Sequence, residues 1–445
     1  METQFAERPL SLTEHQGQSQ QEVGEDSHII CPDQFVLLKM PSGNVKAVRL
    51  KKDTQVSLGK FGNFDTNSII GHPYGYSYEI YEGTKAKIIK NVAFVDVDDT
   101  EANNKDIVDD PAKQNLSHEE IERMKQEGVG GQEIIKKVVE GHSTFNKKTE
   151  YSKAKYIKRK EAKFSKVFTP VKPTLYSVWS YVYSNRPEKI RDLRIDTLSQ
   201  ILTLANVHAN AKYIVVDDVR GMLISGVMER LGGYGFVLGI HEHETPNYDI
   251  IKYMNFTKKI TDSLKTLSWI QVFKDDNEQD FLYKDESKLE EKDLEYYLRK
   301  KMRYERLNDA REALWQGEFD GLLVASQYQP KSILEALLPY VAGSRPIVIY
   351  SIHKEVLVDA FTYLRMSKQC INPEITESWL RNYQVLPGRT HPEMTISGGG
   401  GYILHAKRII NNDDPGYAGP SVETVKRQID KSSSSQDQMM TDAIE

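Results

Sequence analysis

The chain has 445 residues, of which 28% are charged and 39% hydrophobic, and its formal net charge at pH 7 is -5. This length leaves room for two or three domains, each with its own core. No apolar run approaches the ~20 residues that cross a bilayer, and the two cysteines, Cys31 and Cys370, are too far apart in sequence to suggest a disulfide framework or a zinc site, which favours a reducing compartment.

The N-terminal quarter falls into two parts. Residues 1–27 are rich in glutamine and carry six acidic residues against one arginine, so we expect disorder there, and they lack the apolar stretch of a secretory signal. Residues 28–95 consist of short apolar runs separated by turns, of which Pro41-Ser42-Gly43-Asn44 is one. Close spacing of short strands predicts a small β-barrel domain.

Two segments of opposite charge follow. Residues 96–116 form a predicted acidic loop, since seven acidic residues stand against one lysine between Asp96 and Asp110. Residues 117–172 form a predicted helical basic linker. Helices are expected after the capping pair Ser117 and Glu120 and again over 132–140, and residues 147–172 hold ten Lys or Arg against two Glu.

Aromatic side chains are interleaved with this positive charge. Lysines near a phosphate backbone release counterions, and aromatic rings stack on unpaired bases, so we interpret the segment as contacting nucleic acid. A nuclear localisation signal, which does not exclude RNA contact, and a merely solvated helix are the alternatives. The candidate contact residues in this segment are Lys147, Lys148, Lys153, Lys155, Tyr156, Lys158, Arg159, Lys160 and Lys163.

A second, smaller basic group consists of Arg186, Lys189, Arg191 and Arg194, of which the first three are candidate tRNA contacts. It stands just before the helix predicted over 195–206. Ion pairing with Glu188 and Asp192 on a helix surface is the alternative interpretation.

The stretch 211–244 predicts the opening strand-helix-strand unit of a nucleotide-binding α/β domain. Strands are expected over 213–216 and 236–240, with a helix over 222–231 between them. The first turn of such a unit should be rich in glycine, so that bare amides can approach the cofactor. Here the turn reads Asp217-Asp218-Val219-Arg220-Gly221, with a single glycine. The sequence therefore predicts the fold of a cofactor-binding domain without its glycine-rich cofactor-binding loop.

Strands and helices alternate over residues 173–410, which predicts one doubly wound, Rossmann-like domain with an acidic insertion at about 275–292. Further helices are expected over 248–267, 294–314, 332–341 and 354–365. Further strands are expected over 269–273, 319–325, 346–350, 379–385 and 402–410, the last two around a close-packed glycine turn at 398–401. The tail, 411–445, is expected to be disordered.

Besides the glycine-rich turn, a second functional feature is absent from the sequence pattern. The fourth strand ends in Leu323-Val324-Ala325-Ser326, without a carboxylate to serve as base, and Asp320 precedes the strand, at the wrong end for chemistry. The run from His241 to Glu244 alternates on an extended segment and so points two ways, which argues against a metal site. We therefore assign no catalytic, cofactor-binding or metal-binding residue and expect a non-catalytic scaffold.

Several stretches match a known family and cover most of the chain from about 30 to 410. They are VSLGKFGNF (56–64), IIGHPYGYSYEIY (69–81), EEIERMKQEG (119–128), STFNKKTEYSKAKYIKRK (143–160), DTLSQILTLANV (196–207), FDGLLVASQYQP (319–330), GSRPIVIY (343–350), WLRNYQVLPGRTHP (379–392) and SGGGGY (397–402). By these stretches the chain resembles the non-catalytic subunit of the eukaryotic tRNA (adenine-N1) methyltransferase, in a fungal form. That enzyme modifies the T-loop adenine, position 58 of tRNA.

The resemblance implies a fold and a set of partners. The family joins an N-terminal β-barrel to a C-terminal Rossmann-like methyltransferase domain. Its members pair with a catalytic paralogue as a heterotetramer with two of each subunit. S-adenosylmethionine is then bound by the catalytic partner and not by this chain, which supplies surface for tRNA in a nuclear complex.

Within this resemblance, Arg345, Arg381 and Arg389 on late loops are further candidate tRNA contacts. The alternative for Arg345 and Arg381 is ion pairing, either at a subunit interface or within the chain. Two rival functions stay open: an active methyltransferase with an unusual cofactor loop, and a general RNA-binding factor of translation.

Overall fold

The computed structural model describes residues 28–81, 83–89, 131–141, 166–273, 290–386, 389–395 and 397–409. It also describes residues 120, 123–124, 145, 152–153, 155–157, 159–160 and 283. The predictions of disorder for both chain ends, the acidic loop at 96–116 and most of the predicted insertion lie outside these residues. None of the helices described is both long enough and apolar enough to cross a membrane.

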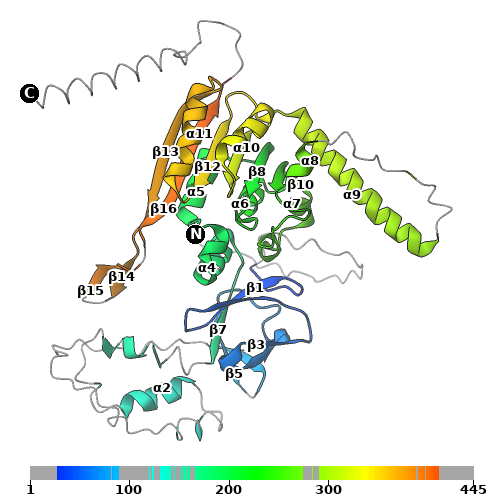
Figure 1. Cartoon of the computed structure of the whole chain (residues 1–445). Coiled ribbons are helices and arrows are strands. Elements are labelled where there is room, and N and C mark those ends of the chain that lie inside the picture. The colour runs from blue at the N-terminus through cyan, green and yellow to red at the C-terminus, as the bar shows by residue number, and fades with distance from the viewer. Residues whose placement is uncertain are drawn as a thin grey trace, which may run out of the picture.

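An antiparallel sheet of five strands forms the N-terminal domain (Figure 1). In spatial order its strands are β2 (Val45–Arg49), β1 (Phe35–Lys39), β7 (Val167–Val171), β5 (Tyr78–Tyr81) and β6 (Lys85–Ile88). A hairpin of β3 (Gln55–Ser57) and β4 (Asn63–Asp65) shares its core, in which the Phe64 and Phe168 rings stack with centroids 4.4 Å apart. An N-terminal β domain is therefore confirmed, although the described strands form an open sheet with a separate hairpin and not the closed barrel that was predicted.

Strand β7 corrects one part of the domain prediction. Residues 167–171 were expected in the helical basic linker, but they pair with β1 and β5 in the middle of the N-terminal sheet. Phe168 and Pro170 are buried on one face because side chains alternate along a strand. Within the linker, the helix expected over 132–140 is confirmed as α2 (Gly131–Glu140), whose apolar face is buried.

A seven-stranded sheet forms the centre of the C-terminal domain. Its order is β10 (Leu264–Ser268), β9 (Gly235–His241), β8 (Ala211–Asp217), β11 (Gly321–Ala325), β12 (Pro346–Ser351), β16 (Gly399–Arg408) and β13 (Cys370–Trp379). The first five strands run parallel, and β16 runs antiparallel to both neighbours. The parallel strands end together at one edge, here called the carboxyl edge, where ligands of such sheets bind.

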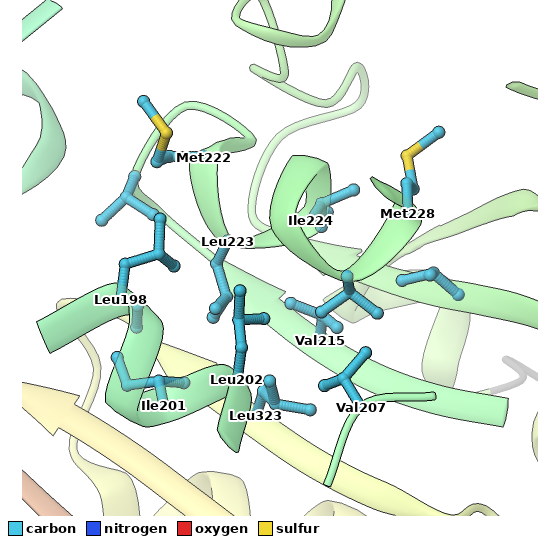
Figure 2. Close-up of a cluster of buried hydrophobic side chains, with 14 of the residues drawn as sticks. Leu198, Ile201, Leu202, Val207, Val215, Met222, Leu223, Ile224, Met228 and Leu323 are labelled. Atoms are coloured by element: carbon cyan, nitrogen blue, oxygen red, sulfur yellow. The ribbon is translucent and has the colours of Figure 1, made fainter. Parts of the chain in front are cut away.

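Helices cover both faces of this sheet, which confirms the predicted α/β class (Figure 1). The first face packs against α4 (Leu175–Asn185), α5 (Ile195–Leu204) and α6 (Met222–Leu231); the second packs against α9 (Glu291–Gln316), α10 (Pro330–Leu337) and α11 (Lys354–Met366). In β8, Val215 points into the first core and Val216 into the second. Figure 2 shows the first core, where Leu202 of α5 and Leu223 of α6 meet Val215.

The segment between β9 and α9 departs from the prediction. The helix expected over 248–267 and the strand expected over 269–273 are wrong. The structure has a 3-10 turn, η7 (Ile251–Met254), then α7 (Lys258–Asp262), β10 and α8 (Trp269–Val272). Asn255 breaks the helix with a left-handed φ of 51°, and the Ser268 N–H donates to Gln271 Oε1 at 2.9 Å where α8 begins.

The late strands also differ from the prediction. The strand expected over 379–385 is confirmed only in part, because it is interrupted at 380–382. Strand β13 ends at Trp379, and a separate hairpin follows, made of β14 (Tyr383–Leu386) and β15 (Arg389–Pro392). The expected glycine turn at 398–401 instead starts β16. Close packing there is confirmed: a Cβ on Gly400 would lie 2.3 Å from Ser378 Oγ, and one on Gly401 would lie 2.6 Å from the Tyr350 ring.

One asparagine side chain fastens the N-terminal sheet to the C-terminal domain. Asn255 Oδ1 accepts from the Phe35 N–H at 2.8 Å, and Asn255 Nδ2 donates to the Phe35 C=O at 2.8 Å. The Phe35 ring meets Tyr253 edge to face at 5.1 Å. Leu37, also on β1, is buried in the first core of the C-terminal domain. The two domains therefore share packed surface and hydrogen bonds.

We expect Gly400→Ala to lower the free energy of unfolding by roughly 1–3 kcal/mol, because a side chain forced into a filled core shifts its neighbours. Thr197 Oγ1 donates to the Gly400 C=O at 2.8 Å and would be displaced. Gly399→Ala is the matched control, since its Cβ would meet nothing closer than 3.6 Å. Urea unfolding measures both variants, and equal midpoints would contradict the close packing.

Candidate functional site

The turn between β8 and α6, Asp217–Gly221, lies at the carboxyl edge, where a cofactor of such a sheet would bind. Asp217 is buried, and its Oδ1 accepts the N–H groups of Val219 at 2.8 Å and Gly221 at 2.9 Å. Its Oδ2 accepts the Ile224 N–H at 3.0 Å. Amides at a helix N-terminus attract anions. In this chain an internal carboxylate already holds three of them.

Tyr248 fills the space between this turn and β9. A Cβ on Gly221 would lie 2.9 Å from Tyr248 Cβ, and a Cβ on Gly239 would lie 2.9 Å from the Tyr248 hydroxyl. The His241 ring meets the Tyr248 ring edge to face at 6.1 Å. Burial raises the pKa of Tyr248 well above its ordinary value, and the nearby Asp217 carboxylate raises it further. The phenol is therefore neutral and packed as part of the core.

The other residues of the turn are held by their side chains. Val219 is fully buried in the first core. Arg220 has a left-handed φ of 62°, and its Nε donates to Asp249 Oδ1 at 2.8 Å while its Nη2 bonds Asp249 Oδ2. The Arg220 C=O accepts the Ile250 N–H at 3.2 Å. These bonds connect the loop after β9 to the turn. At positions where a glycine-rich loop has bare backbone, this turn has residues with side chains.

Polar groups at the ends of the neighbouring strands bond to one another. Asp218 Oδ2 accepts from Ser326 Oγ at 2.6 Å and from the Gln327 N–H at 2.9 Å. Gln327 Nε2 in turn donates to Glu242 Oε2 at 2.9 Å. An acidic residue after the second strand is the group that holds a ribose in dinucleotide-binding sheets. In this chain Glu242 bonds to the loop after β11 instead.

The predicted alternation of residues 241–244 is seen in the side chains. His241 is buried with Nδ1 2.7 Å from the His243 C=O, while Glu242 turns to Gln327. Burial lowers the pKa of His241. Across the residues that the structure describes, no group of three or more His, Cys, Asp or Glu could hold a metal ion.

The predicted nucleic-acid contacts of the basic linker fall into two groups. Lys153 is 6% exposed, with Nζ 6.0 Å from the Phe145 ring centroid, and Tyr156 packs on the buried face of α2. Lys160 Nζ lies 5.0 Å from the Tyr156 ring centroid. Lys155 and Arg159 are exposed, one helical turn apart. Four further candidates lie outside the described residues: Lys147, Lys148, Lys158 and Lys163.

The second basic group lies at the carboxyl edge. Arg186 and Lys189 are exposed around the 3-10 turn η6 (Pro187–Ile190). The C=O of half-buried Arg191 accepts the Tyr350 hydroxyl at 2.9 Å, near the end of β12. In the described part of the chain, no ion pair joins these three cations to Glu188 or Asp192. Their assignment as RNA contacts stays a prediction, with Arg186 and Lys189 accessible.

The three late arginines do not lie together. Arg345 precedes β12 at the opposite edge of the sheet, with Nη2 3.0 Å from Asp320 Oδ1, so the internal ion pair is present. Arg381 lies beside the carboxyl edge, 5.6 Å from the Trp379 ring centroid, with Nη1 donating to the Glu393 C=O at 3.1 Å. Arg389 belongs to β15, and its side chain is outside the described residues.

Tyr248 and Asp249 are absent from the residues that the sequence singled out. They lie about thirty positions after the turn on which they pack, and no local pattern marks such a return contact. Asp217 does carry a signal, because an aspartate between a strand and a helix is a preferred partner of free helix N–H groups.

The strand order defines the class of protein. Five parallel strands in the order β10-β9-β8-β11-β12, followed by an antiparallel β16 inserted before β13, make a Rossmann-like methyltransferase fold. The chain keeps this fold with a turn that has a single glycine after β8.

Within this class, the chain belongs to the Gcd10p family, whose family model matches residues 29–298. It is 32% identical to the tRNA (adenine(58)-N(1))-methyltransferase non-catalytic subunit of Debaryomyces hansenii, covering 86% of this chain and 87% of that protein. It is 30% identical to the Mus musculus protein of the same name, covering 97% and 96%. A solved SAM-dependent O-methyltransferase from Thermotoga maritima is 12% identical with a TM-score of 0.49, covering 87% and 97%. The family resemblance is confirmed.

Burial raises the pKa of Asp217 to about 6 from an ordinary value of 3.8, although its three N–H bonds oppose the shift. Because the folded-state pKa is the higher one, the stability from this group is present below pH 3.8 and is lost as pH rises towards 6 and beyond. We expect Asp217→Asn to remove this pH dependence, so that the difference in unfolding free energy between variant and wild type moves by roughly 2–3 kcal/mol in the variant's favour from pH 4 to pH 7. Urea unfolding across this range measures it, and parallel pH profiles would contradict a buried, titrating Asp217.

Proposed function

We propose that this chain is the non-catalytic subunit of a tRNA (adenine(58)-N1)-methyltransferase, and that it assists N1-methylation of the T-loop adenine by a catalytic paralogue. The relatives named as that subunit support this, because they are 30–34% identical over most of both chains. S-adenosylmethionine is held by the partner in this proposal, and this chain binds none.

One structural observation carries the non-catalytic part of the proposal. Tyr248 packs against Gly221 and Gly239, while Val219 and Arg220 place side chains in the turn that would carry a cofactor. At the end of β11, Ser326 donates to Asp218, and no carboxylate follows that strand to act as a base. In this proposal the turn after β8 does not serve as a cofactor loop, and within the described carboxyl edge no carboxylate directly after β11 is available as a general base.

The second part of the proposal is that this subunit binds tRNA. An enzyme that acts on a base must expose it, which costs a few kcal/mol, and distributed phosphate contacts offset such a cost. Lys155, Arg159, Arg186 and Lys189 support this role, since all four are exposed cations. Lys153 and Tyr156 instead anchor the basic segment on α2.

A heterotetramer with two copies of each subunit is the assembly that we propose. Large exposed apolar side chains mark protein interfaces, and in this chain several gather at the hairpin that extends from the ends of β13 and β16 (Figure 1). They are Trp379, Leu380, Tyr383, Val385 and Met394. We propose this hairpin as a surface for the paralogue.

Nuclear residence belongs to the same proposal. Its support is the basic run Lys158-Arg159-Lys160, which is typical of localisation signals. Imaging of a fluorescent fusion with and without that run checks it, and nuclear signal in neither form would overturn it.

We expect the chain alone to transfer no methyl group to tRNA, and the chain co-purified with its catalytic paralogue to be active. Both preparations are assayed with labelled S-adenosylmethionine on unmodified tRNA. Val385→Asp combined with Tyr383→Asp should remove the paralogue from the purified complex, since both side chains are exposed on the hairpin. Methyl transfer by the isolated chain would refute the non-catalytic assignment and make Asp217, Asp218 and Glu242 cofactor candidates.

We expect Lys155→Glu combined with Arg159→Glu to weaken tRNA binding by the complex and to flatten its salt dependence, by up to about 0.9 in the slope of log K against log salt for each lost phosphate contact. Lys354→Glu with Arg365→Glu on α11 is the control, with the same change in net charge at exposed positions. Filter binding over a salt series measures both. An unchanged slope would exclude this segment from the tRNA contact.

A further inference from the structure

Helix α9 is 26 residues long, and the residues by which it packs on the second core lie in its C-terminal half. In the N-terminal half, Tyr297 is buried as well. Leu307, Ala310 and Leu314 belong to the second core. Residues 291–306 come before these contacts and span about 24 Å at 1.5 Å per residue. Figure 1 shows this half of α9 reaching beyond the sheet. We call residues 291–306 the overhang.

The overhang as a whole has six cations and four carboxylates, and its positive charge is concentrated towards its C-terminal end. Between residues 296 and 306, five cations stand against one carboxylate, that of Glu305. Lys300, Arg303 and Arg306 are exposed, and in the described part of the chain no carboxylate forms an ion pair with them. Arg299 is exposed as well, and its Nη2 bonds Glu295 Oε1 at 2.8 Å one turn away.

The direction of these cations is set by the helix. Arg303 and Arg306 precede Ala310 by seven and four residues, so they lie on the same side of α9 as the residues that pack on the core. Where the core contact ends, this stripe changes from apolar to cationic. Like charges three and four residues apart repel one another and destabilise a helix. A polyanion along the stripe would relieve that repulsion.

We propose that the overhang is a second RNA-contacting surface, which binds phosphate groups of tRNA through Lys300, Arg303 and Arg306. The identity of the RNA rests on the function proposed above. The overhang belongs to the β10 side of the seven-stranded sheet, where Asp309 of α9 pairs with Lys265 of β10 at 2.9 Å. The hairpin β14–β15 follows β13, at the other side of the sheet. The overhang and the hairpin surface proposed for the paralogue therefore lie at opposite sides of this domain.

The test is a triple variant, Lys300→Glu, Arg303→Glu and Arg306→Glu, in the complex with the catalytic paralogue. We expect tRNA affinity at 0.1 M salt to fall about tenfold, and the slope of log K against log salt to lose about two to three. The control reverses three exposed cations, Lys354 and Arg365 of α11 and Lys368 just after it, with the same change in net charge, and should leave both quantities unchanged. A second control, Leu298→Ser with Met302→Ser, changes exposed apolar residues of the overhang and should also leave tRNA binding unchanged.

The outcomes distinguish an RNA-contacting overhang from a solvated helix and from a protein interface. Equal affinity and equal slope for the triple variant and wild type would overturn the inference and leave the overhang a solvated helix. Normal tRNA binding with loss of the paralogue from the complex would identify the overhang as a protein interface and overturn it as well. If the wild-type complex methylates tRNA and the triple variant binds tRNA as tightly as wild type, only this inference is refuted. A wild-type complex without methyl transfer refutes the proposed function.

Discussion

The buried carboxylate of Asp217 is the interaction on which the carboxyl edge depends. Taking a charge out of water is costly, and three N–H bonds from the turn and from α6 offset part of that cost. These bonds fix the path of the chain from β8 into α6. On that fixed path Val219 enters the core and Arg220 reaches Asp249, which brings Tyr248 against Gly221. The edge keeps the form of a methyltransferase with its turn filled by the chain's own side chains.

The sequence correctly predicted those elements whose formation depends on residues close together in the chain. The apolar run of β8, the spacing within α6 and the run of β9 were each found, because buried parallel strands and helices leave distinct periods. The run from Leu264 to Phe273 misled the prediction, since a short apolar run fits a strand or a helix equally well and the pairing with β9 decides. Strand β7 was missed because its partners lie more than eighty residues earlier in the chain.

Counting charges in the sequence located the basic segments, but it did not distinguish exposed cations from cations that are buried or ion-paired. Lys153 and Arg345 looked the same in sequence as Lys155 and Arg186. In the fold, Lys153 is buried beside Phe145, and Arg345 pairs with Asp320 although it is exposed. Lys155 and Arg186 are exposed as well. The difference comes from partners distant in sequence. The bulky residues of the turn after β8 predicted that it is not a glycine-rich loop. No local sequence pattern predicted that Tyr248 packs against it.

The paired hydrogen bonds between Asn255 and Phe35 link the N-terminal sheet to the segment that packs on the turn after β8. The same short segment that carries Asn255 begins with Tyr248 and Asp249, which close the turn after β8. A rotation of the N-terminal sheet must therefore pull on this segment, and through it on the turn. The turn after β8 is thus anchored to the N-terminal domain, and substitutions that remove Tyr248 or Asp249 from the turn would also loosen the contact between the two domains.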